Sequence, residues 1–252
     1  MARDLQFVIH LQMELRYNTI VLKKKEVGET DRLYTLYTLE QGKVQLVAKG
    51  VRKSEAKLAG QLETLMQGLV VVVKGRGTGK IAGAVAEKNF WHLRADGDIL
   101  KRVLETANMF ERLVEWDEPD AELFQLLAMY LALSDDLAKE KQAEKMMLLA
   151  EGFLFQLFAR LGYTIETGAC VVSGEKLQSG EQHFFSPSAG GVLAGEHIRS
   201  VQNAFPVSES AIKLMRIFLS NKLESLSRVR VNEKEFREVR QASTLFFEWI
   251  GV

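Results

Sequence analysis

The order of hydrophobic and polar residues changes character near residue 90. Before that point, short runs rich in Val, Ile, Leu, Tyr and Thr are separated by Gly-containing turns. In the run RLYTLYTL (32–39), side chains alternate with the period of two that is typical of a strand. Gly42 stands in EQGK, where a hairpin needs a positive φ. Five or so strands in fewer than about 80 residues predict a small closed or nearly closed barrel, since closure hides strand edges.

After His92, apolar residues recur at three- and four-residue spacings, which predicts helices. Asp98 is expected to cap the first helix, and Pro119 fits the first turn of the second. A third helix is expected from Lys141 to Leu161 and should end at Gly162. The pattern favours a compact bundle of these three helices.

The rest of the chain has two kinds of segment. Residues 164–200 are rich in Gly and Ser with short extended pieces, which predicts an irregular, partly β insertion. Two helices should follow, over 208–220 and 232–250. We therefore expect an α+β multidomain protein with four parts: a β-barrel (1–90), a helical domain (91–163), a loop region (164–200) and C-terminal helices that pack on the helical domain (201–252).

Charge is distributed unevenly although the formal net charge is zero. Residues 20–80 carry 12 Lys and Arg against 6 Asp and Glu, a net of +6, whereas residues 96–170 carry 7 against 15, a net of −8. A local positive field attracts phosphate whatever the total charge. This distribution indicates the N-terminal third as a binding surface.

Cysteine content and hydropathy limit the setting in which the protein acts. A single cysteine, Cys170, excludes an internal disulfide and favours a reducing compartment. No apolar run approaches the roughly 20 residues that span a bilayer, and the first residues do not have the pattern of a signal peptide. We expect a cytoplasmic protein without a membrane partner.

A cluster of cations interleaved with tyrosines is the strongest candidate for a functional site. Phosphates require cations, and single-stranded bases require aromatic faces on which to stack. A solvated charged face on an unrelated β-domain would have the same composition, so that alternative stays open. The predicted phosphate contacts are Lys23, Lys24, Lys25, Arg32, Lys43, Lys49, Arg52, Lys53, Lys57, Arg76 and Lys80, with Tyr34 or Tyr37 stacking on a base if it points outward.

Other patterns argue against catalysis. The run KGRGTGK (74–80) lacks the glycine spacing and the final Ser or Thr of a phosphate loop. Cys170, His183 and His197 lie too far apart in sequence to be more than a weak metal signal. We predict neither an enzyme nor a cofactor. The run FLFQLF (153–158) has more apolar residues than one helix stripe needs, which leaves a groove for a partner peptide open.

Three motifs resemble the RecO family of bacterial recombination mediators. They are the turn Gly28-Glu29-Thr30-Asp31, the hairpin Gly42-Lys43 and the segment Lys49-Gly50-Val51-Arg52, in the family's order and at close spacing. The resemblance is most specific over 19–62 and extends through the helical part of the chain.

The resemblance implies an oligonucleotide-binding (OB) fold barrel, a helical domain and a loop that often carries a four-cysteine zinc site. It implies a nucleoid-associated protein of RecF-pathway DNA repair that anneals complementary single strands. Such a protein also helps to load RecA onto DNA coated with single-strand-binding protein. Its partners would be single- and double-stranded DNA, RecR and, indirectly, RecA. The C-terminal tail of the single-strand-binding protein, acidic and apolar, would dock on the helical domain.

The zinc site is where this sequence departs from the family. Cys170 occupies the first ligand position, but Ser173, Ala194 and His197 replace the expected cysteines. One thiol and one imidazole do not complete a structural tetrahedron, so we predict a zinc-finger-like insertion that lacks its ligands and binds no metal. The loop would then be held by packing of Phe184, Phe185 and Leu193. The candidates for the partner-peptide site are Arg112, Lys141, Lys145 and Phe155.

The leading hypothesis is therefore a DNA-binding mediator of the RecO type. The alternative is an adaptor whose barrel binds a partner protein while the basic loops are only solvated surface. A third class, an NTP-dependent enzyme, would need nucleotide binding, and the defective loop at 74–80 argues against it. A gel shift with an oligonucleotide at low and moderate salt separates the first two.

Overall fold

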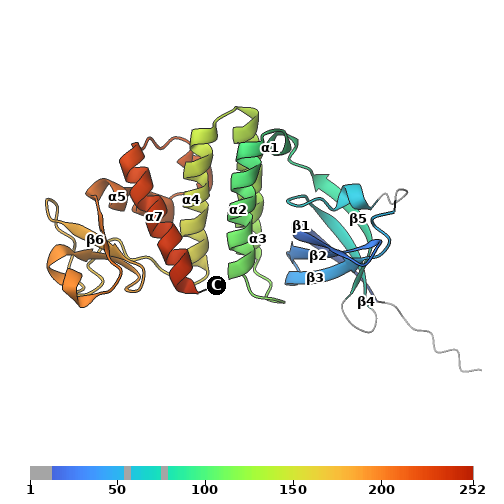
Figure 1. The fold of residues 1–252 in the computed structure, drawn as a ribbon, viewed down its shortest axis with the longest axis horizontal. Coiled ribbons are helices and arrows are strands. Elements are labelled where there is room, and N and C mark those ends of the chain that lie inside the picture. Colours follow the sequence, from blue (N-terminus) through green and yellow to red (C-terminus); the bar gives the residue numbers. More distant parts are fainter. Residues whose placement is uncertain (1–12, 54–57, 75–78, 252) are drawn as a thin grey trace, which may run out of the picture. The chain divides into compact units, whose positions relative to one another are not determined.

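The computed structural model describes residues 13–53, 58–74 and 79–251 (Figure 1). The chain divides into two units, and one of them contains the residues up to Asn89 together with the segment 115–120. The second unit contains Phe90–Val114 and the chain from Ala121 onward. Within the described residues, no helix is both long and apolar enough to cross a membrane.

The first unit is a closed barrel of five strands in the order β1-β2-β3-β5-β4. A 3-10 turn, η1 (Ala59–Gln61), comes before β4. The long strand β1 pairs with β4 through its first half and with β2 through its second half. Such a barrel is consistent with the OB-fold that the resemblance implies. The strands are β1 (Met13–Val27), β2 (Asp31–Thr38), β3 (Gly42–Ala48), β4 (Gln67–Lys74) and β5 (Lys80–Lys88).

The alternation over 32–39 predicts a strand with two distinct faces, but both faces of β2 are buried over most of its length. Residues 34–38 are buried without exception, although only every second side chain can point into the barrel. The segment 115–120 approaches this second face near Tyr37. Lys43, which is paired with Tyr37 in the β2–β3 register, forms a bridge to Trp116. The backbone of that segment therefore lies beside the start of β3, and the Trp116 ring contacts the Lys43 ammonium.

The second unit is built around α4 (Ala143–Arg160), which contacts α2, α3, α5, α6 and α7. Figure 1 shows α4 with α2 and α3 on one side and α5 and α7 on the other. Because helices surround it, α4 is buried without a break from Leu148 to Phe155. The other helices are α1 (Trp91–Ala95), α2 (Gly97–Leu113), α3 (Ala121–Lys139), α5 (Glu209–Ser220), α6 (Leu223–Leu226) and α7 (Glu233–Ile250).

Side-chain caps set the helix starts, and one predicted cap is wrong. The side chain of Asp96, not that of Asp98, accepts a hydrogen bond from the Ile99 amide at 3.1 Å, so α2 begins two residues earlier than expected. At α7, Asn232 and Glu235 form a reciprocal capping box. Pro119 lies two residues before α3, in the segment that belongs to the barrel unit.

A three-stranded sheet in the order β7-β6-β8 extends beyond the predicted loop region, because β8 lies after residue 200, and η2 (Gly195–Ser200) follows β7. Cys170 packs with Phe184 and Leu193 in a small buried cluster, and its Sγ accepts a hydrogen bond from the Ala194 amide at 3.4 Å. In the part of the chain that the structure describes, no three His, Cys, Asp or Glu side chains are grouped to hold a metal. The strands are β6 (His183–Ser186), β7 (Gly191–Ala194) and β8 (Phe205–Val207).

Candidate nucleic-acid interface

Strand register brings many of the predicted cations to one end of the barrel. Arg32 at the start of β2 lies opposite Glu26 of β1 and Ala48 of β3. On the other side of β3, Val47 pairs with Lys80 of β5. Four neighbouring strands therefore present cations at the same end. We call this set the basic end: Lys23, Lys24, Lys25, Arg32, Lys49, Arg52, Lys53 and Lys80.

Asp31 connects the turn between β1 and β2 to the turn after β3, which carries Lys49, Arg52 and Lys53. Its Oδ1 accepts hydrogen bonds from the Gly50 amide at 2.8 Å and from the Thr30 hydroxyl at 3.1 Å, while the Arg52 amide donates to the Thr30 carbonyl at 2.9 Å. The hydrogen bond from Gly50, more than the nearby lysines, holds the pKa of Asp31 below its usual value. The Gly28–Asp31 and Lys49–Arg52 motifs therefore form one structural unit that fixes the backbone beneath the cations.

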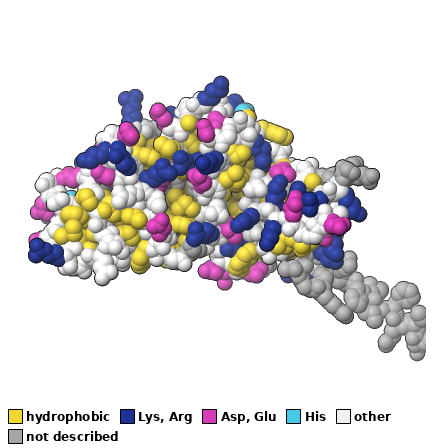
Figure 2. Space-filling view, in the orientation of Figure 1, with side chains coloured by type: hydrophobic (Ala, Val, Ile, Leu, Met, Phe, Trp, Pro, Cys, Tyr) yellow, Lys and Arg dark blue, Asp and Glu magenta, His cyan; other side chains and the backbone are white. Residues whose placement is uncertain are grey.

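Carboxylates occupy part of the basic end. Glu26 lies 3.2 Å from an Arg52 guanidinium nitrogen and 3.9 Å from one of Arg32, and Glu63 is paired with Lys24. Figure 2 likewise shows Lys and Arg side chains of the barrel interspersed with Asp and Glu. Exposed ion pairs are worth only about 0–1 kcal/mol, so a phosphate can compete for these arginines. The remaining cations are exposed lysines: Lys23, Lys25, Lys49, Lys53 and Lys80.

Three predicted contacts are wrong. Tyr34 and Tyr37 are each 0% exposed because their side chains are core residues, so neither can stack on a base. Lys43 is 5% exposed, and its ammonium lies 4.5 Å from the centroid of the Trp116 ring instead of facing solvent. Lys57 and Arg76 lie outside the described residues.

Trp116, an exposed tryptophan of the barrel unit, was not among the site residues predicted from the sequence. Trp116 is 46% exposed and lines a pocket of about 340 Å³ together with Lys74 at the end of β4. A signal for it exists in the sequence, where one aromatic residue stands among acids in EWDEPD (115–120). A large apolar residue in such a polar run is seldom a core residue.

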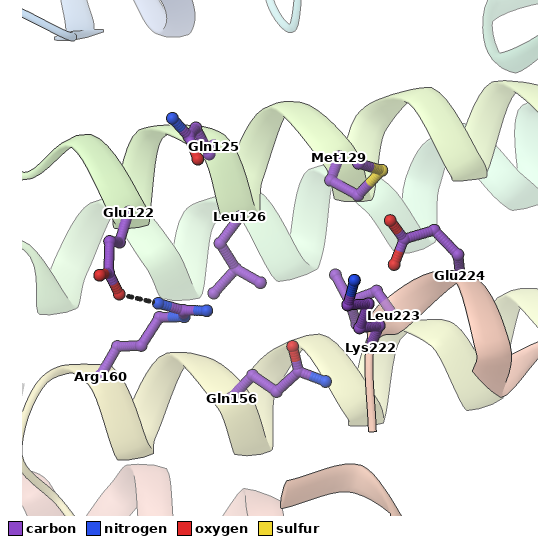
Figure 3. A pocket seen from close by; sticks show the side chains of 9 residues that line it. All are labelled: Glu122, Gln125, Leu126, Met129, Gln156, Arg160, Lys222, Leu223 and Glu224. Atoms are coloured by element: carbon purple, nitrogen blue, oxygen red, sulfur yellow. Dashed lines mark hydrogen bonds and ion pairs between the residues drawn. The ribbon is translucent and has the colours of Figure 1, made fainter. Parts of the chain in front are cut away.

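The helical unit contains a separate pocket of about 410 Å³ (Figure 3). Leu126, Met129 and Leu223 give it an apolar floor. In Figure 3, the ion pair of Arg160 with Glu122 lies at one end, and Lys222 lies with Glu224 at the other. Gln125 and Gln156 complete the lining.

The predicted peptide-site residues do not gather at this pocket. Phe155 is fully buried, with its ring centroid 5.7 Å from that of Phe218, so its assignment to a surface groove is wrong. Arg112 lies over the Phe247 ring at 4.9 Å. Lys145 lines another pocket, of about 210 Å³, beside Asp136 and Glu140, and Lys141 is exposed in the turn before α4.

Comparison with known proteins gives these sites a family context. The family model described as Recombination protein O N terminal matches residues 13–90, and the model described as Recombination protein O C terminal matches residues 106–250. A DNA repair protein RecO of Desulfitobacterium hafniense (strain Y51) is 31% identical, over 92% of this chain and 83% of its own length. DNA repair proteins RecO of Dehalococcoides mccartyi (strain CBDB1) and Myxococcus xanthus (strain DK1622) are 28% and 34% identical. The match to the Dehalococcoides protein covers 91% of this chain and 87% of that protein. The match to the Myxococcus protein covers 70% of this chain and 69% of that protein. The chain therefore belongs to the RecO family of DNA repair proteins.

Proposed function

We propose that the protein is a DNA-binding recombination mediator that anneals complementary single strands and assists RecA loading on DNA coated with single-strand-binding protein. The observation that carries the proposal is the basic end of a member of a DNA repair family, where Asp31 ties the turn that bears Lys49, Arg52 and Lys53 to the start of β2. Single- and double-stranded DNA are the proposed ligands. RecR and, indirectly, RecA are proposed as partners on family membership alone.

Annealing requires no general acid or base. Cations that neutralise the phosphates of two strands release counterions and reduce the repulsion between the strands. Holding both strands on one protein raises their effective concentration, so pairing becomes an intramolecular step. The exposed lysines of the basic end are suited to this role because they are point charges on flexible stems.

A strand-annealing assay tests the proposal directly. Two complementary oligonucleotides, one carrying a fluorophore and the other a quencher, are mixed with the protein in the presence and absence of single-strand-binding protein. We expect annealing faster than the spontaneous rate in both conditions, with a rate that falls as salt is added. A protein that gives no acceleration and no gel shift at low salt would be an adaptor without direct DNA binding.

We further propose that the pocket of Figure 3 binds the C-terminal tail of single-strand-binding protein. Leu126, Met129 and Leu223 would receive an apolar side chain, while Arg160 and Lys222 would meet carboxylates of the tail. The partner of Arg160, Glu122, is largely exposed, so an incoming carboxylate has a weak competitor. The pocket that Lys145 lines is less suitable because it has one cation against two acids, Asp136 and Glu140, whereas two cations match the two acids of the pocket in Figure 3.

Replacing Arg160 by Ala should weaken binding of an acidic, Phe-ended peptide by up to about fivefold, since an ion pair of a partly exposed arginine is worth up to about 1 kcal/mol. Isothermal titration calorimetry on the full chain measures this change. Lys145→Ala serves as the control, because it removes a cation from the other pocket of the same unit and should leave the affinity unchanged. Equal affinities for the wild type and Arg160→Ala would remove the proposed site.

A further inference from the structure

Among the described residues, the barrel closes between β3 and β5 at one place. In the described part of the chain, β5 pairs with β3 through Val47 and Lys80 alone, near the C-terminal end of β3. Near the start of β3, the segment 115–120 pairs with the edge of the strand. Trp116 bridges Lys43 in parallel, and the Asp117 amide donates to the Lys43 carbonyl at 2.9 Å. The pocket of about 340 Å³ lies along this edge.

The ring of Trp116 is held in place although it is 46% exposed. The Lys43 ammonium lies 4.5 Å from its centroid, a cation–π contact, and Lys43 itself is almost fully buried. The backbone on both sides is tied to β3 by the bridge and the hydrogen bond described above. An aromatic ring that is fixed from beneath and partly open to solvent can form a stacking platform without first being ordered.

We propose that this pocket binds one unstacked base of single-stranded DNA, with Trp116 stacking on it. The inference rests on the proposed function, since it presumes that the barrel binds DNA. Gln41 and Gln45 supply amide donors and acceptors for a base edge, and the Asp117 carboxylate can accept from an exocyclic amino group. Lys74 is the cation of the lining that meets the adjacent phosphate.

The charges around the pocket favour a base over the sugar–phosphate backbone. Burial is the main cause that raises the pKa of Tyr17, and the negative charges of Glu40 and Asp117 raise it further. The same two carboxylates disfavour a phosphate deep in the pocket, whereas a neutral base is not repelled. A duplex keeps its bases stacked and paired, so it cannot supply this ligand without paying the energy of unstacking. The site therefore distinguishes single from double strands.

Fluorescence anisotropy with a labelled single-stranded oligonucleotide, and with the duplex of the same sequence, tests the inference on the full chain. Trp116→Ala should lower single-strand affinity about tenfold, as expected for the loss of one base–aromatic stack, and leave duplex affinity within about twofold. Trp116→Phe should retain most of the affinity because a smaller ring still stacks. Trp91→Ala is the matched control, an exposed tryptophan of the other unit.

Fluorescence provides a second readout that does not depend on a loss of affinity. The chain has three tryptophans, so Trp91→Phe with Trp249→Phe leaves Trp116 as the one indole emitter. We expect the single strand to quench this emission and the duplex to leave it nearly unchanged.

Several results would overturn the inference while the proposed function stands. They are wild-type single-strand affinity in Trp116→Ala, an equal loss for single strand and duplex, and Trp116 emission that does not change when the single strand binds. If the wild-type protein binds no DNA at all, the proposed function fails first. The two failures are therefore separate.

Discussion

Reversing three cations of the basic end, with Lys49→Glu, Arg52→Glu and Lys53→Glu together, should lower DNA affinity by about 100-fold or more at low salt. A cation close to a phosphate in water is worth about 1 kcal/mol, so three such interactions amount to about 3 kcal/mol, and the new carboxylates add repulsion. The dependence of log affinity on log salt should also become shallower. On duplex DNA the slope changes by about 0.9 for each phosphate that the protein no longer neutralises.

Anisotropy titrations at several salt concentrations measure both effects. The control carries an equal change of charge in the other unit, Arg228→Glu, Arg230→Glu and Lys234→Glu, at exposed positions. Because Glu26 and Asp31 lie beside the reversed side chains, a Gln version of the triple variant separates the loss of attraction from new repulsion in the turn. If the control weakens binding as much as the triple variant does, net charge and not the basic end controls affinity.

The barrel could be predicted from sequence because its signals are local. Period-two runs and Gly-containing turns each occupy a few residues, and each fixes the backbone where it occurs. The function of Asp31 could not be predicted in this way. Its bond to the Gly50 amide joins positions 19 residues apart, and no periodicity indicates which turn meets which. Both motifs were identified by their resemblance to the RecO family. The strand register explains why they occur together, because it pairs Arg32, directly after the first motif, with Ala48, directly before the second.

The aromatic residues of the barrel show the same limit. Alternation separates Tyr34 from Tyr37 on opposite faces of β2, which predicts that one of them points outward. Both are buried: Tyr34 belongs to the core of the barrel, and a segment more than 70 residues away along the chain bridges Lys43, the partner of Tyr37 in the β2–β3 register. The exposed aromatic, Trp116, comes from that same segment. Local pattern thus assigned the stacking role to the wrong residues, because alternation shows neither which face of β2 is the interior nor that a distant segment approaches the other face.

In the helical unit, periodicity located the helices but misjudged the surplus of apolar residues in FLFQLF (153–158). One apolar stripe is enough for a helix at the edge of a bundle, so additional apolar residues suggested an exposed groove. The helix that carries them, α4, is instead surrounded by five others, and Phe155 packs against Phe218 of α5. The pocket with exposed cations is lined by α3, α4 and the chain around Leu223, a combination that sequence spacing does not indicate.

Gly42→Ala should lower the free energy of unfolding of the barrel unit by about 2–5 kcal/mol, the largest effect that we expect of one methyl group. Sequence predicted the positive φ of this residue, which is +69°, and an Ala there costs about 1–2 kcal/mol. The close approach of residues 115–120 adds the rest. A Cβ at Gly42 would lie 2.1 Å from the Glu118 carbonyl oxygen, so the segment that carries Trp116 must move.

Gly50→Ala is the matched control, because Gly50 has a similar φ of +65° but the nearest atom to its Cβ is 3.8 Å away, on the Lys53 side chain. Gly50→Ala should lower the free energy of unfolding only by the cost of placing an Ala in the left-handed conformation, about 1–2 kcal/mol. Urea unfolding followed by Trp116 emission, in the Trp91→Phe and Trp249→Phe background, reports on the barrel unit where the change is made. Equal destabilisation by Gly42→Ala and Gly50→Ala would mean that the segment 115–120 yields without cost. The ring of Trp116 would then not be held firmly enough to form a preorganised platform.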